Sequence, residues 1–224
     1  MDVRDAIMSR KSVRRFLPKP VPVEAIRRIM ECAGQAPSGH NIQPWKVYAV
    51  AGEARERLCR DILDAIANEP MENHVPEYDY YPTEWYEPYI GRRRKLGHEM
   101  YGLLGIARDD KAAREAQMNR NYIFFDAPVG IFVTMDNRLA TGTFLDMGMF
   151  IQNILIAARG EGLHTCGQAA FTWFHKIIRK HVGMADTETL VCGIALGYED
   201  PDDPVNKLVA ERIPVDEYVT FLGF

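Results

Sequence analysis

Two short segments hold most of the side chains that could bind or transform a ligand. The first, residues 10–16, reads Arg-Lys-Ser-Val-Arg-Arg-Phe, so four cations surround one serine hydroxyl. Guanidinium groups bind phosphate through paired hydrogen bonds, and a hydroxyl group can add another. A solvated basic surface explains the same residues equally well. The segment therefore indicates either a site for a phosphate monoester or an exposed charged loop.

The second segment, residues 36–45, reads Ala-Pro-Ser-Gly-His-Asn-Ile-Gln-Pro-Trp. Pro37 and Pro44 each fix a backbone angle, and Gly39 permits backbone conformations that other residues avoid. Four polar side chains lie between the two prolines. A tight loop that hydrogen-bonds to its own backbone is one explanation. The other is a rigid wall of a site for a planar polar ligand.

An aromatic excursion interrupts the regular patterns at about residues 70–110. Six Tyr and Trp side chains crowd residues 78–89, where Pro82 and Pro88 break any helix. They form either a cluster packed under a long connection or a lid over a pocket. The basic run 92–95 comes next, and a solvated helix face is its favoured interpretation over contact with a ligand.

Composition and charge exclude several classes of function. The 224 residues carry a net charge of −4, which gives no basic footprint for nucleic acid. The four cysteines are widely and irregularly spaced, so neither a disulfide framework nor a zinc site is expected. The sequence contains no P-loop, GxGxxG or GxSxG motif and no signal peptide or membrane span. We expect a cytoplasmic protein without a metal site whose reactivity, if it is an enzyme, comes from a cofactor.

Hydrophobic periodicity indicates one α+β domain spanning residues 1–224. Strand-like composition marks residues 45–50, 128–134 and 190–197, and the tail at 218–221 is also strand-prone. Helical spacing marks residues 2–10, 22–33, 53–67, 96–106, 112–125, 139–159 and 171–182. The helix over 139–159 is apolar on nearly all sides, so it must be buried all round, which a dimer interface achieves readily.

Taken together, the motifs resemble those of the nitroreductase family of flavin enzymes. The resemblance is carried by residues 10–14, 37–45 and 162–169, and by Asp-Met-Gly at 146–148, Gly-Tyr at 197–198 and Arg-Ile-Pro at 212–214. These motifs follow one another in the family's order from residue 1 to the end of the chain. The aromatic excursion is similar to that of the branch that includes nitrobenzoate reductases.

The resemblance implies a three-layer fold, a mixed sheet flanked by helices, and an intertwined homodimer with FMN at the subunit interface. It also implies a reaction in two halves. NAD(P)H gives a hydride to N5 of FMN and leaves, and a nitroaromatic or quinone-like acceptor then takes the electrons. No protein side chain acts as a nucleophile or acid in this scheme.

The family's cofactor-binding roles transfer to matching positions of this sequence. They fall on Arg10, Lys11, Ser12, Arg14, Pro37, Ser38, Gly39, Asn41, Gly167, Gln168, Ala169 and Arg212. The cations and Ser12 hold the phosphate and ribityl chain, and the remaining residues line the ring, partly from the partner subunit. Substrate-pocket candidates are His40, Tyr81, Trp85, Tyr89 and Phe124.

Two alternatives remain open at this stage. A flavin enzyme of the same fold can instead catalyse reductive dehalogenation or ene reduction, although the Tyr- and Trp-rich excursion favours flat aromatic acceptors. A flavin-free dimer that binds a small molecule or a partner protein is the more remote alternative. The sequence does not distinguish NADH from NADPH as the donor.

Overall fold

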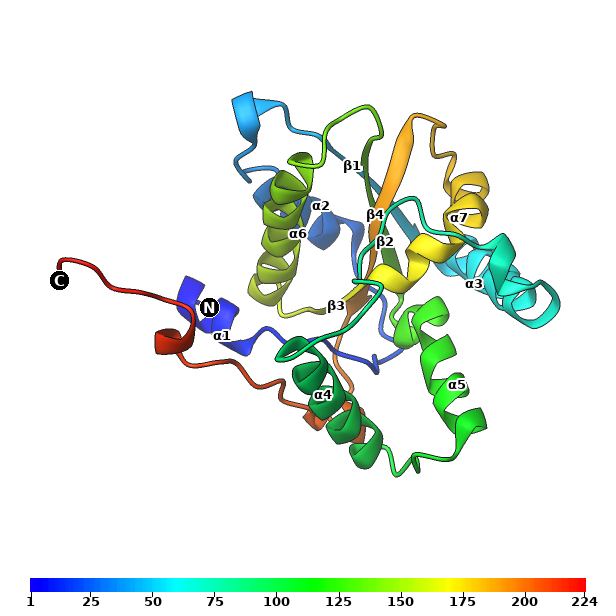
Figure 1. The fold of residues 1–224 in the computed structure, drawn as a ribbon. Helices are drawn as coiled ribbons and strands as arrows, with labels where there is room; N and C mark the ends of the chain where they lie inside the picture. The colour runs from blue at the N-terminus through cyan, green and yellow to red at the C-terminus, as the bar shows by residue number, and fades with distance from the viewer.

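A computed structural model describes all residues 1–224, and its centre is a four-stranded sheet. The strands are β1 (Trp45–Ala51), β2 (Val129–Asp136), β3 (His164–Gln168) and β4 (Glu188–Gly197), in the order β1-β2-β4-β3 (Figure 1). All three neighbouring pairs are antiparallel. The parallel pairing that the expected mixed sheet requires is limited to a bridge between Ser12 and Thr165.

Helices cover both faces of the sheet and produce three layers. On one face, α2 (Val23–Ala33) and α6 (Thr143–Gly160) pack on a core that includes Ile131 and Ile194. On the other face lie α3 (Gly52–Asn68) and α7 (His175–Val182), over a core that includes Phe132. Figure 1 shows the two helix pairs on opposite sides of the strands. The expected three-layer fold is confirmed.

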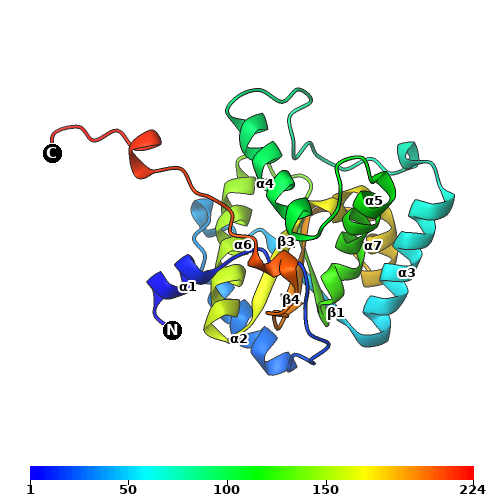
Figure 2. The ribbon, with the colours of Figure 1, turned by 90° about the horizontal axis from the view of Figure 1, so that it is seen from below.

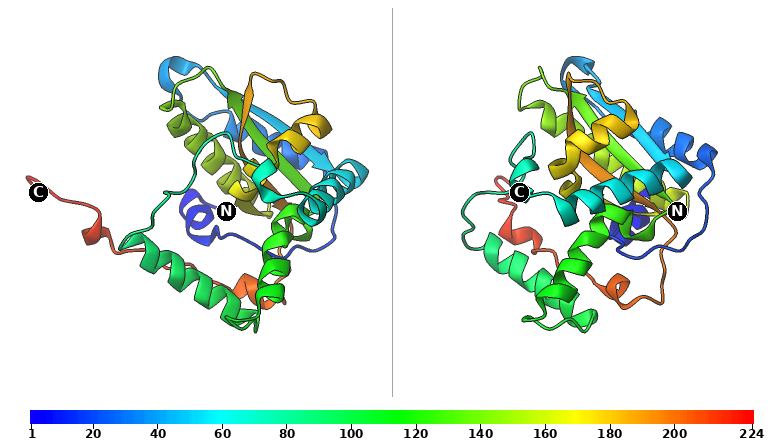
Figure 3. Two further views of the ribbon diagram at one scale, coloured as in Figure 1. Left: turned by 45° about the vertical axis from the view of Figure 1, so that its right-hand side comes forward. Right: turned by 90° about the vertical axis from the view of Figure 1, so that its right-hand side faces the viewer.

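Three further helices and the tail lie outside these layers. Helix α1 (Val3–Ser9) packs against α6, whereas α4 (Tyr89–Leu103) and α5 (Lys111–Asn119) diverge from their connecting loop (Figure 3). The tail after η5 leads away from the body of the chain (Figure 2). The 3-10 helices are η1 (Gly39–Asn41), η2 (Met71–Asn73), η3 (Arg120–Asp126), η4 (Ala169–Phe174), η5 (Pro204–Lys207) and η6 (Val215–Glu217).

None of the helices combines the length and the apolar composition that a membrane crossing requires.

Glycines in the central strands allow large aromatic rings to lie directly on the sheet. A Cβ atom at Gly130 would lie 2.2 Å from Cζ of Phe124, and one at Gly193 would lie 2.4 Å from Cδ2 of Phe171. Real side chains do not approach so closely, so any larger residue at either position would displace a ring. The centres of the two rings lie 4.5 Å apart with the planes tilted by 30°, and both rings are fully buried. The two glycines thus bring η3 and η4 close to the strands.

Several element boundaries differ from the sequence prediction. Residues 164–168 form β3, which was not predicted, and the helix expected over 112–125 ends at Asn119. Helix α4 begins seven residues earlier than predicted, so the basic run 92–95 lies within it. His175 at the start of α7 is buried, and its ring lies 3.5 Å from a carboxylate oxygen of Glu77. No strand forms at residues 218–221.

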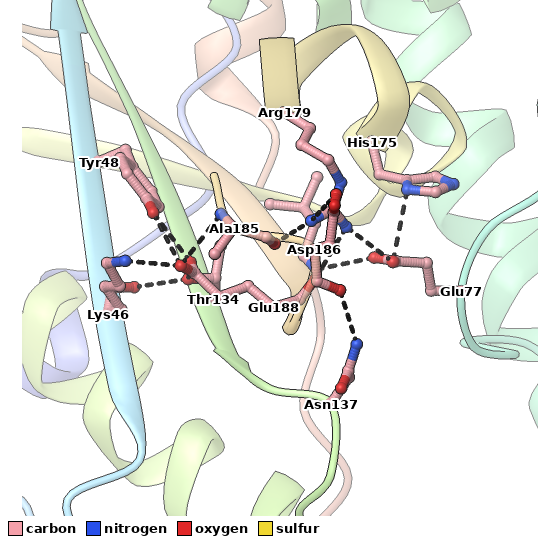
Figure 4. A network of polar contacts seen from close by, with 11 residues as sticks. Lys46, Tyr48, Glu77, Thr134, Asn137, His175, Arg179, Ala185, Asp186 and Glu188 are labelled. Carbon is pink, nitrogen blue, oxygen red and sulfur yellow. Dashed lines mark hydrogen bonds and ion pairs between the residues drawn. The ribbon is translucent and has the colours of Figure 1, made fainter. Parts of the chain in front are cut away.

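A buried carboxylate joins three strands near one end of the sheet (Figure 4). Glu188 of β4 pairs with Lys46 of β1 at 2.6 Å and accepts hydrogen bonds from Thr134 at 2.7 Å and Tyr48 at 3.0 Å. The Ala185 amide adds a longer contact of 3.3 Å. Burial acts to raise the pKa of Glu188, but the hydrogen bonds outweigh it and hold the pKa below its ordinary value. The charged form therefore stabilises the fold.

Replacing Glu188 with glutamine should lower the stability of the fold. Loss of the charge weakens its hydrogen bonds and is expected to cost about 2 kcal/mol, or a fall of about 6 °C in Tm for a chain of this size. Because the folded-state pKa of Glu188 is depressed, its contribution is present above the unfolded pKa and is lost as the pH falls through the folded pKa.

Thermal unfolding scans at neutral and acidic pH test this expectation. Between neutral and acidic pH, the Tm of Glu188→Gln should fall less than the Tm of the wild type. The exposed Glu115→Gln should show the same fall as the wild type. An unchanged Tm for Glu188→Gln at neutral pH would show that the network contributes nothing to stability.

Candidate functional site

The backbone of residues 12–16 runs beside β3 and is held there by its apolar side chains. Val13 and Phe16 are buried, and the Val13 amide donates to the Thr165 carbonyl oxygen at 3.0 Å. The two apolar side chains are thus in the core, with Arg14 and Arg15 between them in the sequence. Arg14 consequently lies on the other side of the segment, next to a cavity.

The cavity has a volume of about 1140 Å³ and lies between α4, α5 and the end of β3. Four predicted cofactor-binding residues line it: Arg14, Gly167, Gln168 and Ala169. Half of its 24 lining residues are hydrophobic, and none is an aspartate or glutamate. Ligand pockets are typically about 300–1,000 Å³ and mostly apolar, so this cavity is large enough for a nucleotide-sized anion.

Three predicted phosphate ligands carry charges that no carboxylate neutralises. Arg14 donates to the Ser12 carbonyl oxygen at 3.2 Å, and Arg212 donates to the carbonyl oxygen of Ala210 at 2.8 Å. Partial burial lowers the pKa of Arg10, and the positive charge of Arg212 lowers it further. Two guanidinium groups that repel each other in this way would be stabilised by a bound anion.

The tail reaches this cluster of cations because α4 holds it. Lys95 of α4 forms an ion pair with Glu211, the residue before Arg212. Cys166 and Ser12 lie beside the cluster, since the Cys166 thiol interacts with the Ser12 side chain and with the charge of Arg14. Burial raises the pKa of Cys166, which keeps the thiol neutral. The cluster is therefore assembled from both ends of the chain.

Lys11, another predicted cofactor-binding residue, does not line the cavity and has its own partners in this chain. Its ammonium group pairs with Glu199 at 2.6 Å and donates to the Asn206 carbonyl oxygen at 2.6 Å. Both contacts hold the side chain toward the C-terminal segment. The local sequence did not reveal these contacts, because Glu199 and Asn206 are distant in sequence.

Gln168 presents a buried oxygen without a partner. The side chain is 3 % exposed, and its Nε2 donates to the Asn121 carbonyl oxygen at 2.8 Å. Its Oε1 accepts no hydrogen bond from the protein. A buried polar atom without a partner is costly, so a ligand with a hydrogen-bond donor would satisfy it. Gly167 and Ala169 beside it have little side-chain bulk, which leaves room for a planar group.

The loop over residues 37–45 lies apart from the cavity within one chain. Figure 1 shows η1 at the upper left, beside the start of α6, and none of the loop residues lines the cavity. The Gly39 amide donates to Asp146 of α6 at 3.3 Å, and the Gln43 amide donates to Ser38 Oγ at 2.9 Å. Pro37, Ser38, Gly39, His40 and Asn41 are therefore not brought together with Arg14.

The same loop has a strained backbone. His40, Asn41 and Gln43 have φ values of 52°, 59° and 47°, in the left-handed region that non-glycine residues seldom occupy. Each such residue costs of order 1–3 kcal/mol, and strain of this kind is concentrated at functional sites. The explanation that the loop merely closes a turn does not account for three strained residues in an exposed segment.

The aromatic excursion begins at an anchor on the sheet. Glu77 accepts the Leu190 amide at 3.0 Å and pairs with Arg179 at 3.1 Å, and the Tyr78 hydroxyl donates to the Val191 carbonyl oxygen (Figure 4 shows Glu77 and Arg179). These contacts cover the part of β4 beyond the end of β3. The excursion is thus fixed at its start. That the rest of it forms a lid over the pocket stays a prediction.

Two predicted pocket residues lie at the cavity or next to it. Tyr81 lines the cavity, and the Trp85 ring packs 5.5 Å from the Tyr81 ring. The guanidinium group of Arg93, which also lines the cavity, lies 4.6 Å from the centre of the Trp85 ring. Tyr89 is 49 % exposed and packs on Tyr86 rather than on the cavity wall.

Phe124, a predicted substrate-pocket residue, does not line the cavity of this chain. Its ring is fully buried and packs on Phe132 and Phe171. The cause is a left-handed stretch of backbone, with φ values of 55° at Phe124 and 53° at Phe125. This turn directs the Phe124 ring into the core, and nothing in the local sequence announces it.

Further cations surround the cavity, and two of them, Arg93 and Arg94, come from the basic run 92–95, for which a solvated helix face was the favoured interpretation. Arg93, Arg94, Arg108 and Arg114 line it, and none of the four pairs with a carboxylate. The Arg114 guanidinium group lies 3.9 Å from the centre of the Tyr101 ring. A cationic cavity with aromatic walls suits flat anionic ligands. No cluster of three or more His, Cys, Asp or Glu side chains could hold a metal ion.

Comparison with known proteins agrees with this geometry. The family model described as "Nitroreductase family" matches residues 7–198. The 4-nitrobenzoate reductase of Nocardioides sp. (strain LMS-CY) is 40% identical over 222 residues, which cover 97% of this chain and 89% of that protein. The chloronitrobenzene nitroreductase of Comamonas testosteroni is 37% identical over 220 residues, covering 98% and 96% of the two chains.

A solved structure shows the same fold along its whole length. The FMN and NADPH-dependent nitroreductase NfnB from "sphigopyxis sp. strain HMH" superposes with a TM-score of 0.96 at 36% identity, covering 100% of both chains. The sequence comparisons and the structural superposition thus both match this chain over most or all of its length. The chain belongs to the nitroreductase family.

Proposed function

We propose that this protein is an FMN-dependent oxidoreductase that transfers electrons from NAD(P)H to nitroaromatic or quinone-like acceptors. The observation that carries the proposal is a cavity without carboxylates, beside three unpaired guanidinium groups. FMN and NAD(P)H are both anionic and partly planar, as such a cavity requires. The relatives named above act on nitroaromatic compounds, which supports the same class of acceptor here.

The residues present fit FMN in two independent respects. Arg10, Arg14 and Arg212 supply guanidinium groups for a phosphate, and their charges have no other partner. Gln168 supplies a buried oxygen that lacks a hydrogen-bond donor, next to the small residues Gly167 and Ala169. The cluster would hold the phosphate, and residues 167–169 would hold an edge of the ring.

Each part of the chain then has a defined task. When bound, FMN supplies the site that accepts a hydride and passes electrons on. The guanidinium groups fix the phosphate end, and Gln168 fixes the orientation of the ring through its hydrogen bonds. Apolar side chains from α4, such as Ile90 and Leu96, exclude water from the cavity. No side chain needs to gain or lose a proton for these tasks.

We also propose that the enzyme is a homodimer. Leu145 and Met149 of α6 are 75 % and 39 % exposed although the helix is strongly apolar, and Phe221 and Leu222 in the tail are 60 % and 80 % exposed. Exposed apolar groups on this scale mark an interaction surface. A second copy covering α6 would bring its own 37–45 loop toward the cavity, which gives the strained loop a use.

Steady-state kinetics test the proposed reaction. With NADPH and a nitroaromatic acceptor varied together, we expect parallel lines in double-reciprocal plots, because the donor leaves before the acceptor binds. A panel of a nitroarene, a quinone, an enone and a halotyrosine should give the highest kcat/KM with the first two. Fastest turnover of the halotyrosine, with release of halide, would replace the proposal with a dehalogenase.

A further inference from the structure

The side chain of Asn206, in η5, joins the N-terminal cation segment to the C-terminal segment. It is 2 % exposed and uses both of its polar atoms. Its Oδ1 accepts the Arg14 amide at 2.8 Å, and its Nδ2 donates to the carbonyl oxygens of Arg15 and Asp200, each at 2.8 Å. Its backbone carbonyl oxygen accepts Lys11 Nζ at 2.6 Å. One residue thus contacts three residues of the 10–16 segment.

The other backbone contacts of this segment show why Asn206 is decisive. The amides of Val13 and Phe16 donate to the carbonyl oxygens of Thr165 and Phe125, on either side of Arg14. The amide of Arg14 has no backbone partner and depends on Asn206 alone. The segment is held by main chain at its flanks and by one side-chain amide at the residue that faces the cavity.

We infer that Asn206 is a positioning residue that sets the place of Arg14, and through it the preference of the site for a phosphorylated flavin. This inference rests on the proposed function. Without Asn206, the Arg14 amide and the Arg15 carbonyl oxygen lose buried partners, and the backbone must shift to find new ones. A guanidinium group then moves with its Cα atom, and bidentate contact with a phosphate is sensitive to such movement.

Comparing FMN with riboflavin separates this role from a general structural one. Riboflavin has the same ring and ribityl chain but no phosphate, so Arg14 has no charged group to bind in it. In Asn206→Ala, the ratio of FMN affinity to riboflavin affinity should fall roughly tenfold, a change typical of losing an optimally placed charged hydrogen bond. Riboflavin binding itself should change little.

A matched control is a buried hydrogen bond far from the cluster. Thr134→Val removes the hydroxyl that donates to Glu188 at 2.7 Å. It should lower Tm and leave the ratio of affinities unchanged. If Asn206→Ala lowers both flavin affinities equally, as a loosened fold would, the positioning role is wrong. If the alanine variant does not fold, Asn206→Ser can replace it, because serine leaves a smaller cavity. The ratio of FMN affinity to riboflavin affinity should then fall by a smaller factor.

A double-mutant cycle tests whether Asn206 acts through Arg14. In an Arg14→Ala background, Asn206→Ala should leave the FMN-to-riboflavin ratio unchanged, because the group that it positions is gone. An equal fall in both backgrounds would contradict the inference. A wild-type protein that binds FMN no tighter than riboflavin would instead contradict the proposed phosphate site, so the two failures are distinguishable.

Discussion

Arg14→Ala is expected to weaken FMN binding by roughly ten- to a hundredfold, the range for losing a hydrogen bond to a charged group. Arg14 lies at the cavity wall, its backbone is held on both sides, and no carboxylate shares its charge. Its guanidinium group is therefore available to bind a phosphate. Fluorescence titration of the apoprotein with FMN measures the change directly.

Arg138→Ala provides the charge-matched control for this experiment. Arg138 is exposed and pairs with Asp136, so its loss changes the net charge equally without touching the cavity. Its FMN affinity should equal that of the wild type. Arg212→Ala should lie between the two, because Arg212 is exposed and belongs to the tail. Equal affinities in Arg14→Ala and Arg138→Ala would refute the assignment of the phosphate site.

Leu145→Asp is expected to convert the protein from a dimer to a monomer. Leu145 is 75 % exposed on the most apolar helix of the chain, and burying a leucine side chain contributes about 1.5–3 kcal/mol. Two copies would each bury an aspartate at a symmetric interface, where unpaired charges are strongly unfavourable. Light scattering measures the mass, and FMN titration of the same samples shows whether a monomer still holds the cofactor.

Val75→Asp tests whether any exposed apolar residue would give the same result. Val75 is 60 % exposed, and it lies just after η2 rather than on α6. This variant should keep the wild-type mass and FMN affinity. A dimer that survives Leu145→Asp would place the interface elsewhere, and a monomer that binds FMN normally would show that the 37–45 loop of a second copy is not needed.

The sequence predicted the elements whose signals are local. Strand-like composition identified β1, β2 and β4, and the apolar spacing of α2, α3 and α6 identified those helices to within a few residues. The three-layer fold and the family followed from motif order and are confirmed by the comparisons. From the cation segment, Arg14 lines the same cavity as residues 167–169, and the cofactor-binding roles of these residues stay predictions.

The remaining features depend on contacts that a linear pattern does not contain. Strand β3 is short and glycine-containing, so only its pairing with β4 makes it a strand. The left-handed turn that buries Phe124 requires the space left by Gly130. Asn206 resembles an ordinary turn residue until the fold places it against a segment 192 positions earlier. Lys11 likewise pairs with Glu199, a residue far away in the sequence.

The central claim is that the cavity beside Arg14 holds a functional FMN. Its most direct test is the absorption spectrum of the purified protein, reconstituted with FMN, freed of excess and then treated with NADPH without oxygen. We predict a yellow protein with one FMN per chain, whose colour is bleached by NADPH and restored by a nitroaromatic acceptor. A protein that remains colourless after reconstitution, or a bound flavin that NADPH leaves oxidised, would contradict the account.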